Sequence, residues 1–153
     1  MTVEDDISFF ERVPTLGLLG RQALRILAIG AETRYVHSGE VLFNAGDEGE
    51  GGFVVQEGSF QLAPAGDHGK AVVVGPYTLL GEVALFADSA RAATATALEP
   101  SSVLFVPRPL FLKMLDSFPD SARKLRDLFA GRLNQSARDI SAVRAVLDGY
   151  DHE

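Results

Sequence analysis

The residues of this sequence best suited to chemistry lie at 80–94, where Gly81-Glu82 precedes a single Arg91. Gly81 lets a ligand approach the backbone closely, and a helix beginning near Glu82 would direct N–H groups outward toward an anion. Arg91 can add a permanently charged, bidentate donor to the same anion. A carboxylate at Glu82 would repel an anion unless it accepts a hydrogen bond from a hydroxyl group elsewhere on the ligand. The pattern therefore predicts a site for a sugar phosphate or a nucleotide.

The surrounding residues, 33–106, have the pattern of a small antiparallel β structure. Short runs rich in Val, Phe and Thr alternate with turns such as Ser38-Gly39 and Glu57-Gly58. The expected strands are 34–37, 41–44, 53–57, 59–63, 71–74, 91–98 and 101–106. About eight short strands of this kind predict a jelly-roll-like antiparallel β-roll, with Arg91 at the start of a strand.

Helical periodicity flanks the predicted roll on both sides. Apolar residues recur at helical spacing near the N-terminus, and a short helix is expected from Pro107 to Ser117. Asp120 then opens a long helix that extends to about Asp148, because Pro119 is tolerated only at a helix start. The sequence thus predicts a single α+β domain over 1–153, with N-terminal helices at 1–32, the roll at 33–106 and two C-terminal helices at 107–150, the last one long.

The long helix also carries a seam suited to pairing with another helix. Alternating steps of four and three residues connect Phe129, Leu133, Ser136, Ile140, Val143, Leu147 and Tyr150. We expect the first half of this seam to pack on the roll. From Ile140 onward a partner helix is the better interpretation, which suggests a homodimer through the C-terminal helix.

Composition restricts the classes of function. The chain has 153 residues, 46% of them hydrophobic, enough for a core without disulfides. It has no cysteine, and none of its three histidines has metal-ligand spacing, so no metal site is expected. The net charge of −7, with no basic residue between Arg34 and Lys70, disfavours nucleic acid as a partner. The acidic N-terminus and the lack of a long apolar run predict a cytoplasmic protein with no membrane partner.

The segments Gly81-Glu-Val-Ala-Leu85 and Arg91-Ala-Ala-Thr94 together resemble the phosphate-binding cassette of cyclic nucleotide-binding domains. We call residues 80–94 the cassette. The order of helices, roll and helices is similar to that of the family over nearly the whole chain. The ten-residue step from Gly81 to Arg91 is that of cyclic AMP-dependent kinase regulatory subunits and cyclic nucleotide-gated channels. Leu80 replaces a usual aromatic residue and Ala90 a usual proline, which we expect to alter affinity rather than abolish binding.

The resemblance implies roles for individual residues. Glu82 would bind the ribose 2′-hydroxyl and Arg91 the cyclic phosphate, with backbone N–H groups near Ala84 and Ala92 completing the cradle. Alanine at position 92, where members selective for cyclic GMP often have threonine, favours cyclic AMP. The implied contacts with phosphate and ribose are Leu80, Gly81, Glu82, Val83, Ala84, Arg91 and Ala92.

The resemblance also implies that the last helix covers the base, for which Phe129, Arg132 and Leu133 are the candidates. Phe129 could stack on the purine, and Arg132 could offer a cation–π or hydrogen-bond contact. The alternatives are ordinary core packing for Phe129 and Leu133 and a solvated helix charge for Arg132.

The resulting hypothesis is a standalone sensor of cyclic AMP, with cyclic GMP as the second choice of ligand. Its C-terminal helix would move on binding and would be read by an unidentified protein partner. No cofactor and no catalytic residue are expected, because no serine is placed beside a base by a recognisable motif. Two alternatives stay open: an adaptor that binds no nucleotide and dimerises through the C-terminal helix, and a regulatory fragment of a channel or transcription regulator.

Overall fold

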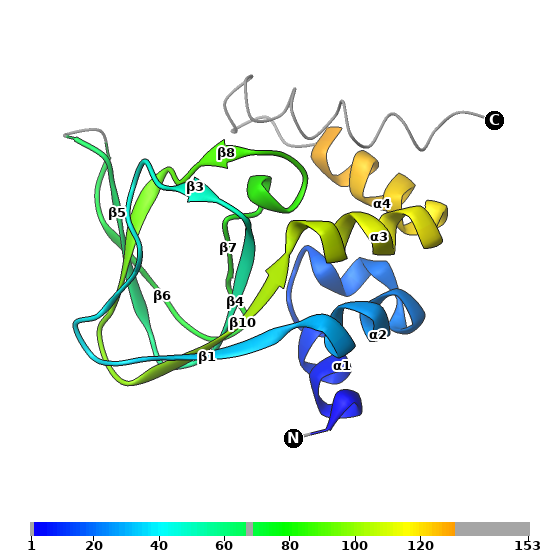
Figure 1. Ribbon diagram of the computed structural model, residues 1–153, viewed down its shortest axis with the longest axis horizontal. Coiled ribbons are helices and arrows are strands. Elements are labelled where there is room, and N and C mark those ends of the chain that lie inside the picture. The colour runs from blue at the N-terminus through cyan, green and yellow to red at the C-terminus, as the bar shows by residue number, and fades with distance from the viewer. Residues whose placement is uncertain (1, 67–68, 131–153) are drawn as a thin grey trace.

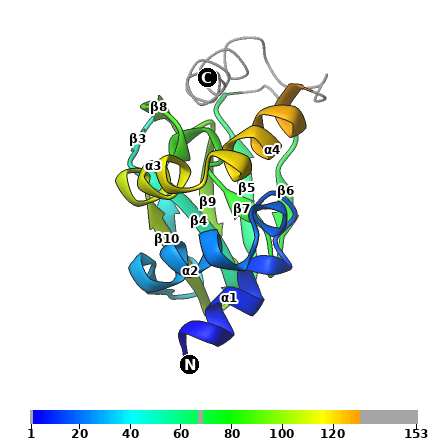
Figure 2. The ribbon, with the colours of Figure 1, turned by 90° about the vertical axis from the view of Figure 1, so that its right-hand side faces the viewer.

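Helices from both ends of the described chain gather on one side of a β-roll (Figures 1 and 2). The computed structural model describes residues 2–66 and 69–130, and side chains only up to residue 128. A capping box between Thr2 and Asp5 starts the first helix, and prolines lie in the first turns of the last two. No helix in the described ranges is long and apolar enough to cross a membrane. The helices are α1 (Val3–Glu11), the 3-10 helix η1 (Leu16–Leu19), α2 (Arg21–Gly30), α3 (Arg108–Ser117) and α4 (Pro119–Ala130).

The strands of the described residues all pair antiparallel. They form one four-stranded sheet in the order β1-β10-β4-β7, a second in the order β2-β9-β5-β6, and the short pair β3-β8. Their bounds are β1 (Glu32–Val36), β2 (Val41–Phe43), β3 (Glu48–Gly49), β4 (Gly51–Glu57), β5 (Phe60–Pro64), β6 (Val72–Val74), β7 (Leu79–Leu80), β8 (Ser89–Ala90), β9 (Ala93–Ala97) and β10 (Ser101–Pro107).

Strand β10 separates two hydrophobic cores, because successive side chains of a strand point to opposite faces. Val103 and Phe105 belong to the core inside the roll, which also contains Phe53 of the neighbouring strand β4. Leu104 and Val106 face the other way and pack in the core formed with the helices. The roll and the helices are thus held together through the central pair β4–β10.

The fold class predicted from the sequence is confirmed, since the structure is an antiparallel β-roll with helices before and after it. It contains ten strands in the described residues rather than about eight. Three of the ten have no counterpart among the seven ranges expected from the sequence: β3, β7 and β8, each two residues long and too short to show a period. The long C-terminal helix is described only as far as Ala130, so the seam from Leu133 onward lies outside the described residues.

The helix expected near Glu82 is a single 3-10 turn, η2 (Val83–Leu85). The regular turn ends at Leu85. The carbonyl of Ala84 within the turn and that of Ala87 after it accept hydrogen bonds from the Arg108 guanidinium at 3.0 and 3.2 Å. The chain then turns back and pairs as β8. The cassette is therefore an irregular segment whose shape depends on contacts with the rest of the domain.

Candidate functional site

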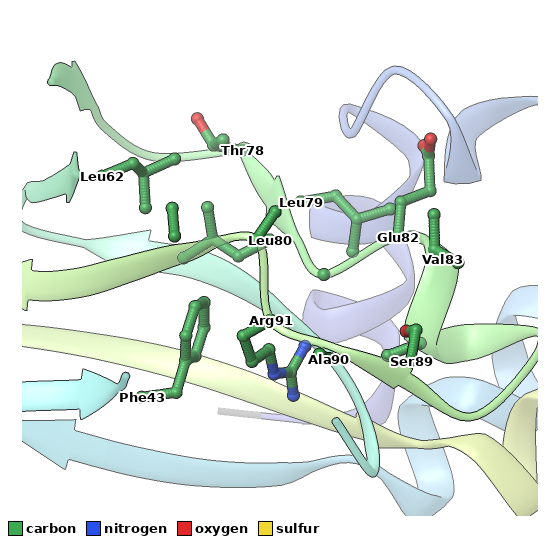
Figure 3. Close-up of a pocket in the computed structure, with 14 residues that line it drawn as sticks. Phe43, Leu62, Thr78, Leu79, Leu80, Glu82, Val83, Ser89, Ala90 and Arg91 are labelled. Carbon is green, nitrogen blue, oxygen red and sulfur yellow. The ribbon is translucent and has the colours of Figure 1, made fainter. Parts of the chain in front are cut away.

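A cavity of about 310 Å³ lies against the cassette (Figure 3). Phe43 of β2 and Leu62 of β5 contribute apolar side chains to its lining. This volume is at the lower end of the range for small-molecule sites, which suits a ligand of mononucleotide size. All seven residues that the sequence assigned to phosphate and ribose line this cavity: Leu80, Gly81, Glu82, Val83, Ala84, Arg91 and Ala92.

Arg91 is placed by its backbone and by two aromatic rings. It lies between β8 and β9 rather than inside a strand, and its N–H donates to the Asp47 carbonyl at 2.7 Å. Its guanidinium carbon is 4.5 Å from the centroid of the Phe43 ring and 5.4 Å from that of Phe53. Cation–π attraction at such distances favours the charged group on the ring faces. The residue is only 8% exposed, so the cation is held inside the protein.

Two glycines leave the space that this guanidinium occupies. A Cβ atom on Gly81 would lie 2.0 Å from Arg91 Nη1, and one on Gly49 would lie 3.0 Å from the guanidinium carbon. Gly81 also has φ +77°, in the left-handed region that side chains other than glycine rarely adopt. The glycine before Glu82 is therefore needed twice, for its backbone conformation and for the place of the arginine.

The charge of Arg91 is incompletely compensated by the protein. Burial lowers the pKa of Arg91, the positive charge of Arg108 lowers it further, and Asp47 and Glu50 act in the opposite direction. Arginine nevertheless stays protonated in proteins. Its Nη1 atom is buried and has no hydrogen-bond partner among the described residues. Because an unsatisfied buried cation is unfavourable, the site is suited to an anionic ligand.

Glu82 lines the same cavity but directs its carboxylate elsewhere. Glu82 Oε2 accepts a hydrogen bond from Thr15 Oγ1 at 2.6 Å. Figure 3 shows this carboxylate pointing away from the Arg91 guanidinium. The negative and positive groups of the cassette therefore point in different directions from the backbone around Gly81.

The backbone donors expected near Ala84 and Ala92 differ in their surroundings. The Ala84 N–H donates to the Gly81 carbonyl at 3.1 Å within η2. A phosphate at this position would have to share that donor or replace the carbonyl. Ala92 is exposed and lines the cavity, so its side of the site is accessible to a ligand.

Arg108 is a part of the site region that the sequence reasoning missed. Its Nη1 donates to the carbonyls of Gly49, Ala84 and Ala87 at 2.9, 3.0 and 3.2 Å. Its Nη2 pairs with Asp88. One side chain at the start of α3 thus connects strand β3 with η2 and with Ala87, which follows η2 in the cassette. Its position between Pro107 and Pro109, at the boundary of roll and helix, was the available signal in the sequence.

The residues expected to cover the base are not located by the structure. The backbone of Phe129 lies in α4, but its side chain is outside the described part of the chain, as are Arg132 and Leu133. Within the described ranges, no group of three or more His, Asp or Glu side chains is arranged to hold a metal ion.

Comparison with known proteins identifies the class to which this fold and site belong. The family described as the cyclic nucleotide-binding domain matches residues 33–118, more than half of the chain. The chain therefore belongs to the cyclic nucleotide-binding domain family, and the resemblance stated from the cassette is confirmed. The matched range includes the whole cassette and extends to the residue after α3.

Individual relatives share this domain. The cAMP-dependent protein kinase regulatory subunit of Yarrowia lipolytica is 29% identical over 119 residues, 78% of this chain and 30% of that protein. A lysophospholipase of Aspergillus oryzae is 30% identical over 120 residues, 76% of this chain and 8% of that protein. The solved structure of a cyclic nucleotide-binding-like protein from Brucella abortus has a TM-score of 0.64 and 32% identity, covering 73% of this chain and 98% of that chain. The chain thus spans less than a tenth of the lysophospholipase and under a third of the kinase subunit.

Proposed function

We propose that this chain binds cyclic AMP in the cavity beside the cassette and acts as a sensor of that nucleotide. The observation that carries the proposal is the buried Arg91 guanidinium, whose Nη1 has no partner in the described part of the chain and lies next to Gly81. A cyclic phosphate would accept hydrogen bonds from this group and neutralise its charge. The size of the cavity and membership of the family support the same ligand class.

Cyclic AMP is proposed over cyclic GMP for three reasons. Ala92 lines the cavity and has no hydroxyl group with which to recognise a guanine amino group. The rest of the wall includes the apolar side chains of Phe43, Leu62 and Leu80, which can contact a purine without selecting guanine. The kinase regulatory subunit of Yarrowia lipolytica, described as cAMP-dependent, supports this choice as a relative.

We further propose that the domain regulates rather than catalyses, and that nucleotide binding moves the C-terminal helix. The contacts that support this are those of Arg108, which joins the cassette to the first residue of α3. A shift of the cassette on binding would therefore displace Arg108 and, with it, the start of the C-terminal helices. The alternative of a non-binding adaptor is disfavoured, because it would keep a buried, unsatisfied cation with no purpose.

Titration calorimetry with cyclic AMP and cyclic GMP tests the proposal, with Arg91→Ala as the site variant. Loss of a charge-assisted bidentate contact should cost on the order of 2–4 kcal/mol, roughly thirty- to a thousandfold in affinity. Arg34→Ala is the matched control, since Arg34 also stacks on Phe105 and Phe53, at 4.2 and 5.5 Å, but does not line the cavity. Unchanged binding in Arg91→Ala, or an equal loss in both variants, would contradict the site.

A further inference from the structure

The Glu82 carboxylate, which the family resemblance assigns to the ribose, already has a partner within the protein. Thr15 Oγ1 donates to Glu82 Oε2 at 2.6 Å, across 67 positions of sequence. A hydrogen bond this short to a charged acceptor is stronger than one between neutral groups. The carboxylate points away from Arg91, on which the phosphate would rest (Figure 3). Turning the carboxylate toward a ribose beside that phosphate would therefore break its hydrogen bond with Thr15.

Thr15 is held firmly in place on its side of this contact. The residue is only 6% exposed and directly precedes η1. Its neighbours Val13 and Leu16 are 0% and 1% exposed and belong to the core formed with the helices. The Gly17 N–H donates to the Val13 carbonyl at 2.7 Å. Because this segment is anchored by buried side chains, Thr15 cannot follow Glu82 into the cavity without disturbing the core.

We infer that Thr15 is a positioning residue that determines how strongly the site recognises the ribose 2′-hydroxyl. The inference rests on the proposed binding of cyclic AMP. In the state described here, Thr15 holds the Glu82 carboxylate toward the N-terminal segment. Binding of a ribose hydroxyl exchanges the Thr15 hydrogen bond for one with the ligand, so most of the gain from that new bond is offset. The site of this chain accordingly has a weakened dependence on the 2′-hydroxyl.

A comparison of cyclic AMP with 2′-deoxy-cyclic AMP separates this role from a general structural one. The deoxy ligand has no hydroxyl to offer, so Glu82 stays with Thr15 and removal of the Thr15 hydroxyl should leave that affinity unchanged. Cyclic AMP, in contrast, no longer competes with the Thr15 hydroxyl in Thr15→Val. Its affinity should rise about three- to tenfold, the equivalent of one net hydrogen bond. A merely structural role of Thr15 would shift the affinities of both ligands together.

The experiment measures both ligands by calorimetry on the wild-type chain, Thr15→Val, Thr15→Ser and Ser121→Ala. Thr15→Ser keeps the hydroxyl and should behave as wild type. Ser121→Ala is the matched control, because Ser121 Oγ donates to the Leu19 carbonyl at 2.8 Å and holds the same N-terminal segment without contacting Glu82. Its ratio of affinities for the two ligands should equal that of the wild type.

The expected result is a rise in the preference for cyclic AMP over its deoxy analogue in Thr15→Val alone. Equal shifts for both ligands, no shift, or weaker cyclic AMP binding in Thr15→Val would overturn the inference while leaving the proposed function intact. Failure of the wild-type chain to bind either ligand would overturn the proposed function, and the inference with it. A shift of the same size in Ser121→Ala would also overturn the inference, since it would trace the effect to loosening of the segment.

Discussion

Gly81→Ala is the substitution whose consequences follow most directly from the geometry of the site. The new Cβ would lie 2.0 Å from Arg91 Nη1, and φ +77° would place alanine in the left-handed region. The backbone conformation alone should cost about 1–2 kcal/mol. The contact adds to this, because Arg91 cannot retreat freely: Phe43 and Phe53 lie on its faces, and Gly49 lies behind it. Overpacking of this kind costs about 1–3 kcal/mol, so the free energy of unfolding should fall by about 2–5 kcal/mol.

Gly39→Ala isolates the backbone part of this cost. Gly39 has φ +84°, but a Cβ there would meet nothing within 4 Å. Urea unfolding of both variants should show a loss of about 1–2 kcal/mol for Gly39→Ala and a clearly larger loss for Gly81→Ala, at unchanged m-values. Calorimetry should show weakened cyclic AMP binding only in Gly81→Ala. Equal stability losses together with wild-type affinity in both variants would refute the assignment of Gly81 as the residue that makes room for Arg91.

Two further predictions concern the surroundings of the site and the N-terminal helix. Arg108→Ala removes the side-chain donor from three backbone carbonyls and should lower the free energy of unfolding by about 2–4 kcal/mol in urea titrations. The control is Arg123→Ala, which removes an exposed ion pair with Asp120 and should change the free energy of unfolding by less than about 1 kcal/mol. Asp6 has a buried Oδ1 without a partner among the described residues, and desolvation raises its pKa, so the folded state loses stability as this carboxyl ionises with rising pH. Asp6→Asn should therefore stabilise the chain at pH 7, by less than about 1 kcal/mol because the side chain is only partly buried, and the gain should vanish near pH 3; a gain independent of pH would contradict this explanation.

Local patterns were sufficient for the roll and for the cassette. The strands longer than two residues show in the sequence as short apolar runs between turns, and the cassette shows as a fixed spacing of Gly81, Glu82 and Arg91. The seven residues so selected come to line one cavity because β7, η2 and β8 follow one another directly along the chain. Residues that are close in the sequence are here also close in space, so no long-range contact had to be predicted to bring these seven together.

The contacts that complete the site depend on tertiary structure and could not be read from the sequence. Thr15 meets Glu82 across 67 positions, and Arg108 meets Ala84 across 24. Thr15 breaks no local rule of helix or turn composition, and the prolines on either side of Arg108 indicate a boundary between elements but not the carbonyls that its side chain binds. Gly81 shows the same limit, because its left-handed backbone could be guessed from glycine but its contact with Arg91 Nη1 could not.

The hydrogen bonds of Arg108 also determine how this domain can open. From Gly81 to Ala92 the cassette contains only one 3-10 turn and the two-residue strand β8, and segments with so little regular structure usually exchange their amide hydrogens through small local fluctuations. Here the carbonyls of Ala84 and Ala87 are bound to a side chain at the first position of α3. Any opening of the cassette that frees these carbonyls must break bonds to the start of a core-packed helix. The cassette and the beginning of α3 therefore form one cooperative unit of local unfolding, although they are different kinds of structure.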